Sequence, residues 1–446
     1  MGDRMVRQAS LILLLIASVA FKALPQTPTP SAREMYEEAA NYATRRFQEF
    51  DRKKLGFDRQ LYEKTLQEQQ ELARKRAAQL SMRADLRGED LYYLGLLFDL
   101  GGQPEGALDA LRRFLREAMA ASNEQKQMAR AIIAVHAAQR GQIEEAKEML
   151  TEYRNHEPRK APELLALERT LAAACYKAKR NDCALQHARA AFELVKQHHT
   201  EFDPDQRAHL LLATADDLTM IHALTDKREE VLAVWRELQR LGLTLPSADL
   251  FRQATRRLKS YDDRATEDLS DPEKASAPTS NAPPAPEITA AEWLGTQPVK
   301  LADLRGRVVL LDFWAYWCEP CLSSFPKLRE LHRKYSARGL TIIGVTQYYG
   351  QERGIPMTPK EELKFLRAFK KQFDLPYGIA IETNDETSSR YGVRSLPTSV
   401  LIDRRGVVRF ISVGISEAEM ERLTRWVEKL LAEPATEGMR QAEARP

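Results

Sequence analysis

The spacing of apolar residues divides the chain into two parts. From 31 to 261, apolar residues recur three and four positions apart with few prolines, which is the period of an α-helix. From 287 to 432, short β-branched runs alternate with helical stretches, which indicates a layered α/β domain. Between them, residues 262–286 are acidic and rich in Pro, Ala and Ser, a composition typical of a linker. Residues 433–446 form a polar tail.

Three segments of the helical part share a pattern of two small residues twelve positions apart, on either side of a polar turn. The pairs are Gly95 and Ala107, Ala134 and Ala146, and Ala172 and Ala184. Small side chains let two antiparallel helices approach closely, so the pattern predicts helical hairpins, with a weaker fourth copy at 225–238. These units resemble tetratricopeptide repeats (TPRs), although they recur every 38 to 39 residues and lack the signature tryptophan. An irregular helical bundle is the alternative.

The second part contains five predicted strands and three predicted helices. The strands lie at 307–315, 340–346, 377–382, 397–403 and 406–414, and the helices at 321–335, 359–373 and 416–431. The first strand is almost wholly apolar, as expected for a strand buried on both faces. Ser416 and Glu419 have the spacing of a capping box at the start of the last helix.

Composition and charge narrow the class of protein. The 446 residues, 43% of them hydrophobic, suffice for more than one folded core. The 67 basic and 64 acidic residues nearly cancel, so no nucleic-acid partner is expected. The chain has only four cysteines, too few for a disulfide framework.

The N-terminus is typical of an exported protein. Arg4 and Arg7 precede an apolar run from Ala9 to Phe21, and residues 18–20 are small enough for a signal peptidase. We interpret residues 1–20 as a signal peptide or a short N-terminal anchor, since a spanning helix needs about 20 apolar residues. The rest of the chain is then expected in the periplasm or another exported, oxidising compartment, where disulfides persist.

Cys175 and Cys183 lie on either side of the turn of the third predicted hairpin. Across such a turn their Cα atoms can reach the roughly 4.4–6.8 Å that a disulfide requires. Two buried free thiols are the alternative, because free cysteine often packs as a small apolar residue. Neither arrangement is expected to be catalytic.

The other two cysteines follow the first predicted strand directly. They stand in the stretch LADLRGRVVLLDFWAYWCEPC, which ends at Cys321, and a second stretch, GVRSLPTSVLID, ends at Asp403. Together these motifs resemble the TlpA/ResA-like exported thiol-disulfide oxidoreductases over residues 287 to 432. This resemblance implies that the second part is an α/β thioredoxin-like domain. With the all-α TPR-like region before it, the chain is expected to be multidomain. The resemblance also implies a redox-active Cys318–Cys321 disulfide, with no other cofactor and no metal.

The place of the dithiol predicts the role of each cysteine. Cys318 stands where a strand ends and a helix begins, and there free N–H groups and the helix dipole stabilise a thiolate. We therefore expect Cys318 to be the nucleophile and Cys321 to be the resolving thiol, which attacks the mixed disulfide. Pro320 fits the first helical turn, where a missing N–H has no effect. Glu319 adds a negative charge between the cysteines, which disfavours the thiolate.

Two further site residues follow from the resemblance. Asp312 interrupts the apolar strand six residues before Cys318, where thioredoxins carry a buried acid. A desolvated carboxyl there is expected to have a raised pKa and to accept the proton of Cys321, whereas an ordinary strand-end aspartate is the alternative. Pro397 matches the cis-proline that faces the dithiol, and Leu396 beside it offers its backbone to an extended substrate.

Other residues around the dithiol are expected to shape the site, and two positions differ from the residues usual in the family. Trp317 and Trp314 are expected to form an apolar rim, with a core role as the alternative for Trp314. The polar loop at 347–359 resembles the central insertion of the family, and its role is either partner recognition or surface elaboration. ResA-like proteins usually carry Asn in place of Asp312, and a functional Glu where this chain has Ser324.

These features predict an exported thiol-disulfide oxidoreductase, with reduction of protein disulfides favoured over their formation. A membrane electron donor of the thiol-reducing type would supply the enzyme with electrons. The TPR-like array would bind a protein partner. One alternative is a TPR-like adaptor whose thioredoxin-like domain has little redox activity, and another is a disulfide oxidase or isomerase. A zinc site is not expected, because zinc needs about four ligands and this domain has two cysteines.

Overall fold

The computed structural model of the chain describes residues 29–117, 119–261, 272–273 and 282–434. The signal peptide predicted at 1–20 lies outside the described residues, as do most of the linker at 262–286 and most of the tail at 433–446. Within the described residues, none of the helices combines the length and the apolar content that crossing a bilayer requires. The chain forms two compact units, Met1–Arg159 and Lys160–Pro446, and the predicted domain limits remain a proposal.

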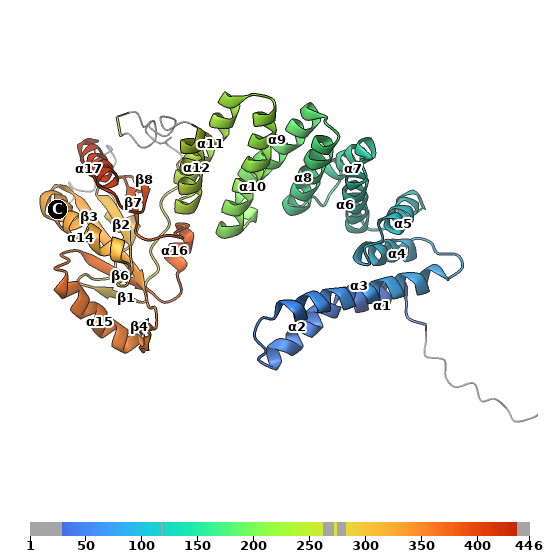
Figure 1. Cartoon of the computed structure of the whole chain (residues 1–446), viewed down its shortest axis with the longest axis horizontal. Helices are drawn as coiled ribbons and strands as arrows, with labels where there is room; N and C mark the ends of the chain where they lie inside the picture. Colours follow the sequence, from blue (N-terminus) through green and yellow to red (C-terminus); the bar gives the residue numbers. More distant parts are fainter. Residues whose placement is uncertain (1–28, 118, 262–271, 274–281, 435–446) are drawn as a thin grey trace, which may run out of the picture. The chain divides into compact units, whose positions relative to one another are not determined.

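The described part of the first unit is helical. Its helices are α1 (Ala32–Ala40), α2 (Tyr42–Arg52), α3 (Arg59–Ser81), α4 (Glu89–Leu100), α5 (Pro104–Glu117), α6 (Asn123–Gln139) and α7 (Ile143–Asn155). Helix α4 packs against α5, and α6 packs against α7, as hairpins joined by short turns (Figure 1). These are the first two helical pairs that the sequence predicts.

The small residues of the repeat pattern lie where paired helices meet. Gly95 of α4 faces α5, and a Cβ at this position would come within 2.5 Å of the Leu111 side chain. Ala107, Ala134 and Ala146 are all at most 2% exposed. Larger side chains at these positions would push the helices apart.

The second unit begins with further paired helices. They are α8 (Ala161–Lys177), α9 (Asn181–Gln197), α10 (Pro204–Leu224), α11 (Arg228–Thr244) and α12 (Ala248–Tyr261). Helices α8 and α9 form the third predicted hairpin, in which Cys175 is bridged to Cys183 with Cα atoms 5.7 Å apart. The alternative of two free thiols is therefore not adopted. The fourth copy predicted at 225–238 covers the turn into α11 and its first half.

The rest of the second unit is a sheet flanked by helices. The strands are β1 (Glu292–Leu294), β2 (Val308–Phe313), β3 (Leu340–Gln347), β6 (Gly378–Glu382), β7 (Thr398–Ile402) and β8 (Val408–Val413), and the helices are α14 (Glu319–Tyr335), α15 (Pro359–Gln372), α16 (Glu386–Arg390) and α17 (Glu417–Ala432). The sheet order is β1-β6-β3-β2-β7-β8. Strands β2, β3 and β6 run parallel, whereas β7 is antiparallel to β2. All five predicted strands and three predicted helices are present, whereas β1, α16 and the small hairpin of β4 (Gln351–Glu352) and β5 (Ile355–Pro356) were not predicted.

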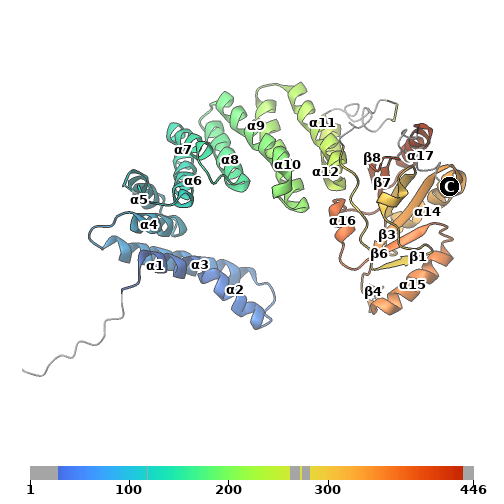
Figure 2. The same ribbon diagram turned by 180° about the vertical axis from the view of Figure 1, so that it is seen from behind.

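Both faces of the sheet are covered. On one face, Leu310 of β2 packs in a core with Phe325 of α14 and Trp426 of α17. On the other face, the core includes Ala248 and Phe251 of α12, so a helix that precedes the predicted linker completes it. Both views show α12 beside the β7–β8 end of the sheet (Figure 1, Figure 2). The sequence predicted no such contact.

The capping box predicted for the last helix is half formed. The Ser416 hydroxyl accepts the N–H of Glu419 at 3.2 Å. The Glu419 carboxylate does not bond back to the N-cap backbone, because it accepts the Ser412 hydroxyl at 3.1 Å and pairs with Arg422 at 2.9 Å. The cap therefore ties α17 to β8, where Ser412 lies.

We expect Gly95→Val to lower the free energy of unfolding of the first unit by about 1–3 kcal/mol, because the added atoms would overpack the contact with Leu111. Urea unfolding followed by circular dichroism measures this. Gly56→Val is the matched control, since nothing lies within 4 Å of a Cβ at Gly56. Adding Leu111→Ala to Gly95→Val should restore part of the loss. Equal stability of the two glycine variants would contradict the packing argument.

Candidate active site

The dithiol lies at the junction between strand β2 and helix α14. Cys318 is the N-cap residue of α14, and Pro320 stands in the first turn, as the sequence predicts. Cys318 is bonded to Cys321 with Cα atoms 5.3 Å apart. The Cys318 carbonyl accepts the N–H of Cys321 at 2.9 Å and of Leu322 at 3.2 Å, so the disulfide closes around the first helical turn.

The two cysteines differ in exposure. Cys318 is 5% exposed, whereas Cys321 is fully buried. Only Cys318 borders the pocket described below. This is the arrangement that the predicted roles require, because an incoming disulfide reaches Cys318 first and Cys321 only through it.

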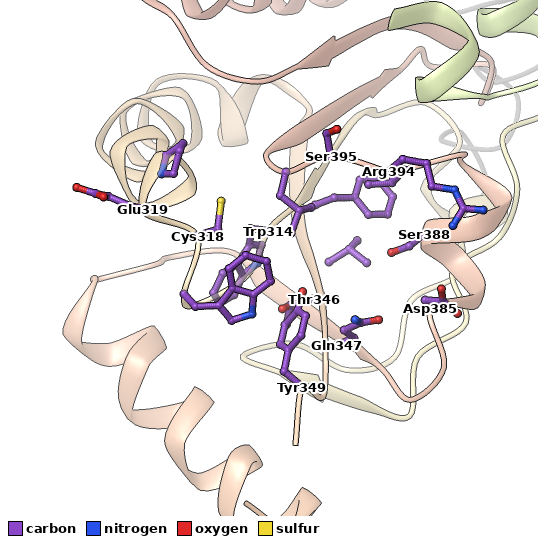
Figure 3. A pocket seen from close by; sticks show the side chains of 16 residues that line it. Trp314, Cys318, Glu319, Thr346, Gln347, Tyr349, Asp385, Ser388, Arg394 and Ser395 are labelled. Atoms are coloured by element: carbon purple, nitrogen blue, oxygen red, sulfur yellow. The ribbon is translucent and has the colours of Figure 1, made fainter. Parts of the chain in front are cut away.

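A pocket of about 670 Å³ lies next to Cys318, at the carboxyl ends of β2 and β3 (Figure 3). Five of the eight predicted site residues line it: Trp317, Cys318, Glu319, Pro320 and Leu396. Cys321 and Asp312 are buried, and Pro397 follows Leu396 through a cis peptide bond. Five of the predicted residues therefore meet at one pocket.

The opposite wall of the pocket was missed by the sequence analysis. It is formed by Asp385, Ser388 and Arg394, which Figure 3 shows across the pocket from Cys318. Asp385 is the N-cap residue of α16, and Ser388 lies within this helix. The helix is too short to show a periodic pattern of apolar residues in the sequence. Arg394 stands inside the motif GVRSLPTS, close to Pro397. This position in the motif was the signal by which the sequence could have indicated that Arg394 belongs to the site.

The two tryptophans have different surroundings. Trp317 is 60% exposed and meets the Tyr349 ring edge-on, with centroids 5.4 Å apart. Trp314 is 1% exposed and stacks on Phe369 with centroids 5.3 Å apart. Both line the pocket, so Trp317 forms the rim, and Trp314 belongs to the core and to the pocket floor.

The loop at 347–359 is anchored at its base. Glu362 of α15 is fully buried, and its carboxylate accepts the N–H groups of Tyr349 at 2.7 Å and Gly350 at 2.9 Å. Tyr349 lines the pocket, whereas Ile355 in the β4–β5 hairpin is 69% exposed. The base of the loop therefore contributes to the site, and its hairpin faces solvent.

The Asp312 carboxyl is buried next to the Ser399 hydroxyl. It is 1% exposed, and neither carboxylate oxygen has a hydrogen-bond partner among the described residues. Burial raises the pKa of Asp312 to about 7, and the neighbouring Ser399 hydroxyl opposes this rise only in part. Burial, followed by the Asp312 charge, also raises the pKa of Tyr377. The burial that would raise the pKa of this acid is thus present, and its role as proton acceptor stays a prediction.

The position that ResA-like proteins fill with Glu has a structural role here. The Ser324 hydroxyl donates to the Cys321 carbonyl at 2.7 Å and is buried. It has no acidic group to exchange protons with the dithiol. Within the described residues, no three His, Cys, Asp or Glu side chains are grouped to hold a metal ion.

We expect Asp312→Asn to stabilise the chain more at pH 8 than at pH 4.5. The folded-state pKa of about 7 exceeds the unfolded value of about 3.9, so the wild-type chain loses stability as the pH rises from about 4 to 7. The variant lacks this loss. The difference in free energy of unfolding between variant and wild type should therefore be larger at pH 8 than at pH 4.5, by at most about 4 kcal/mol. Urea unfolding of the oxidised protein at both pH values measures it. Asp303→Asn, an exposed control, should show no such change, and an equal effect at both pH values would contradict the raised pKa.

Known proteins resemble the C-terminal part of the chain. The AhpC/TSA family matches residues 282–411. The thiol-disulfide oxidoreductase ResA of one Bacillus cereus strain is 32% identical over 146 residues, which are 33% of this chain and 76% of ResA. ResA of Bacillus thuringiensis subsp. konkukian is 34% identical over 146 residues, with the same shares of both chains.

Among solved structures, a thiol:disulfide interchange protein from Chlorobium tepidum TLS is 24% identical and aligns with a TM-score of 0.29, covering 35% of this chain and 100% of its own. The sequence matches to ResA carry the assignment, because they combine more than 30% identity with about three quarters of the relative's length. Through its C-terminal domain and its CxxC pair, the chain belongs to the ResA-like family of thiol-disulfide oxidoreductases.

Proposed function

We propose that the chain reduces disulfides of exported proteins, with Cys318 as the nucleophile. The observation that carries this is the Cys318–Cys321 pair at the N-terminus of α14, with only Cys318 bordering an open pocket. A merely structural disulfide would not need such a pocket beside it. The intact CxxC pair also speaks against a redox-inactive adaptor.

The reaction proceeds through one mixed disulfide. In the reduced enzyme, the Cys318 thiolate attacks one substrate sulfur, and the substrate disulfide breaks as the new bond forms. The Cys321 thiolate then attacks the Cys318 sulfur and displaces the second substrate thiolate. Two electrons pass to the substrate, whose two thiolates take up protons, and the enzyme is left with the Cys318–Cys321 disulfide.

Asp312 is proposed to accept the proton that Cys321 must lose before it attacks. Side chains alternate along a strand, so Asp312 faces the same side as Leu310 and Trp314, which share a core with Cys321. A carboxyl with a pKa of about 7 exchanges protons readily near neutral pH. Because Ser324 is not acidic, this acid on the strand would replace the acid that related proteins carry on the helix.

The pocket beside Cys318 suits a polypeptide substrate. Leu396 lines the pocket beside Cys318, and backbone in such a place can pair with an extended segment. Trp317 and Tyr349 offer apolar surface beside the sulfur, while Asp385 and Arg394 offer charge across the pocket. Protein disulfides are therefore the proposed substrates.

The direction of electron flow is proposed from the charge beside the dithiol. Glu319 directly follows Cys318 and is exposed, and its negative charge disfavours a thiolate on Cys318. A less stabilised thiolate makes the dithiol a stronger reductant. Such a reductase requires a membrane electron donor of the thiol-reducing type, and the helical region is proposed to bind a protein partner.

We expect Cys321→Ser to accumulate covalent complexes with substrate proteins, because Cys318 can attack but no thiol releases the product. Cys318→Ser should trap none. Both variants are made with Cys175→Ser and Cys183→Ser, so that only the dithiol can react. Non-reducing electrophoresis and mass spectrometry of the exported fraction detect the complexes. Trapping by Cys318→Ser alone would reverse the assigned roles.

We expect the reduction potential of the Cys318–Cys321 pair, measured in the full chain with Cys175→Ser and Cys183→Ser, to lie closer to the roughly −270 mV of thioredoxin than to the roughly −120 mV of a strong disulfide-forming protein. Glu319→Gln should raise this reduction potential by about 10–20 mV, because removal of the negative charge stabilises the Cys318 thiolate and with it the reduced form. Glu330→Gln, an exposed change on the same helix, should have no effect. Equilibration with glutathione measures the potential, and a value near −120 mV would favour disulfide formation instead.

A further inference from the structure

The first turn of α12 contacts the segment that leads into the wall of the active-site pocket. The N–H of Ala248 donates to the Tyr391 carbonyl at 2.8 Å, and the N–H of Asp249 donates to the Gly392 carbonyl at 2.9 Å. The first N–H groups of a helix have no partner within the helix. Here two of them are satisfied by the backbone that leads into the cis-proline segment.

This contact is too close for any side chain at Gly392. Gly392 has φ +56°, and a Cβ there would lie 2.6 Å from the Ser247 hydroxyl oxygen and 3.1 Å from the Ser247 Cα. Ser247 is itself buried, and its carbonyl accepts the N–H of Phe251 at 3.0 Å. Glycine at Gly392 is therefore favoured both by the backbone conformation and by the close approach of α12.

Apolar packing surrounds the two hydrogen bonds. Ala248 and Phe251 share a core with Tyr391, which is fully buried. The Tyr391 hydroxyl donates to the Pro286 carbonyl at 2.6 Å. The Tyr391 ring also lies 5.6 Å from the ring of Phe313, which lines the pocket. The first turn of α12 thus adjoins the packing behind the pocket.

In the sequence, the contact point lies between two groups of residues that line the pocket. The four residues after Gly392, which are 393–396, all line the pocket, as do Asp385 and Ser388 on the preceding side. The N–H of Val393 donates to the Ser388 carbonyl at 2.8 Å, so the two sides are closed into one unit. A shift of Tyr391 and Gly392 would therefore move the whole wall.

We propose that the first turn of α12, residues 247–249, positions the pocket wall formed by residues 385–396 for binding an extended polypeptide. The N–H groups of Ala248 and Asp249 are positioning groups in this sense, since they act on substrate through the wall. The inference rests on the reductase function proposed above. It goes beyond that function because it makes the helical region a working part of the substrate site.

The proposal separates two classes of substrate. A protein disulfide lies along the wall and against Leu396, whereas a small aromatic disulfide needs only to reach the Cys318 sulfur. Displacing the wall should therefore impair the first class and spare the second. A change that damaged the dithiol itself would impair both.

The first test is Ala248→Pro in the full chain. Ala248 is the first residue of α12, where proline is compatible with a helix, so the substitution removes the N–H to Tyr391 without interrupting the helix. Insulin is reduced with dithiothreitol as electron donor. The small substrate, 5,5′-dithiobis(2-nitrobenzoic acid), is mixed with chain that has first been reduced and freed of dithiothreitol, because dithiothreitol reduces this compound directly, and a single turnover is followed. We expect KM for insulin to rise roughly five- to tenfold, as loss of one buried hydrogen bond implies. The kcat for insulin and the rate with the small disulfide should stay within twofold of wild type. The reduction potential should stay within a few millivolts of wild type.

The second test reaches the same contact from the other side. Gly392→Ala places a methyl group against Ser247, so KM for insulin should rise in the same way. Gly306→Ala is its control, because Gly306 has φ +91° with nothing within 4 Å of a Cβ. Asn123→Pro, at the first residue of α6 in the other unit, is the control for Ala248→Pro. Both controls should bind insulin as wild type does.

Three outcomes would overturn the proposal. The first is a folded Ala248→Pro or Gly392→Ala with wild-type KM for insulin, where folding is checked by circular dichroism. The second is an equal loss of activity on both substrates, which would place the damage at the dithiol. The third is a wild-type chain that reduces neither substrate, which would remove the proposed reductase together with this inference. If Ala248→Pro does not fold, the KM of Gly392→Ala for insulin tests the proposal in its place.

Discussion

Strand β2 is buried along its whole length, and the rest of the second unit is arranged around that constraint. All six of its residues, from Val308 to Phe313, are buried, and it lies between a parallel and an antiparallel neighbour in the sheet. Such a strand needs apolar cover on both faces. Helices α14 and α17 supply one cover, and the segment around Tyr391, together with α12, supplies the other.

The chemistry of the site follows from where that strand ends. Because β2 leads directly into α14, Cys318 lies at the helix N-terminus and Cys321 lies against the core. Asp312 is the exception to the apolar rule of the strand, and the Ser399 hydroxyl offsets the effect of its burial only in part. A group that opposes folding in this way is typical of a functional site, where stability is given up for reactivity.

The periodic elements of the fold could be predicted from the sequence, because their spacing of apolar residues is distinctive. The dithiol and the Leu396–Pro397 segment could also be predicted, since each stands in a motif with a physical reason for its residues. The wall at Asp385 and Ser388 could not, because α16 spans only five residues. The bridge between Cys175 and Cys183 remained open, because their spacing suits both paired and free cysteines.

The packing of α12 on the sheet was hidden by the composition of the segment that follows it. A run of Pro, Ala, Ser and acidic residues suggests that two modules are separated, yet Phe251 before that run shares a core with Ile411 after it. Residues 287–432 therefore do not complete their own core, because α12 supplies part of it. A gene fusion that moved this stretch alone would expose the surface that Ala248 and Phe251 cover, so inheritance of the helices and the dithiol as one piece is favoured.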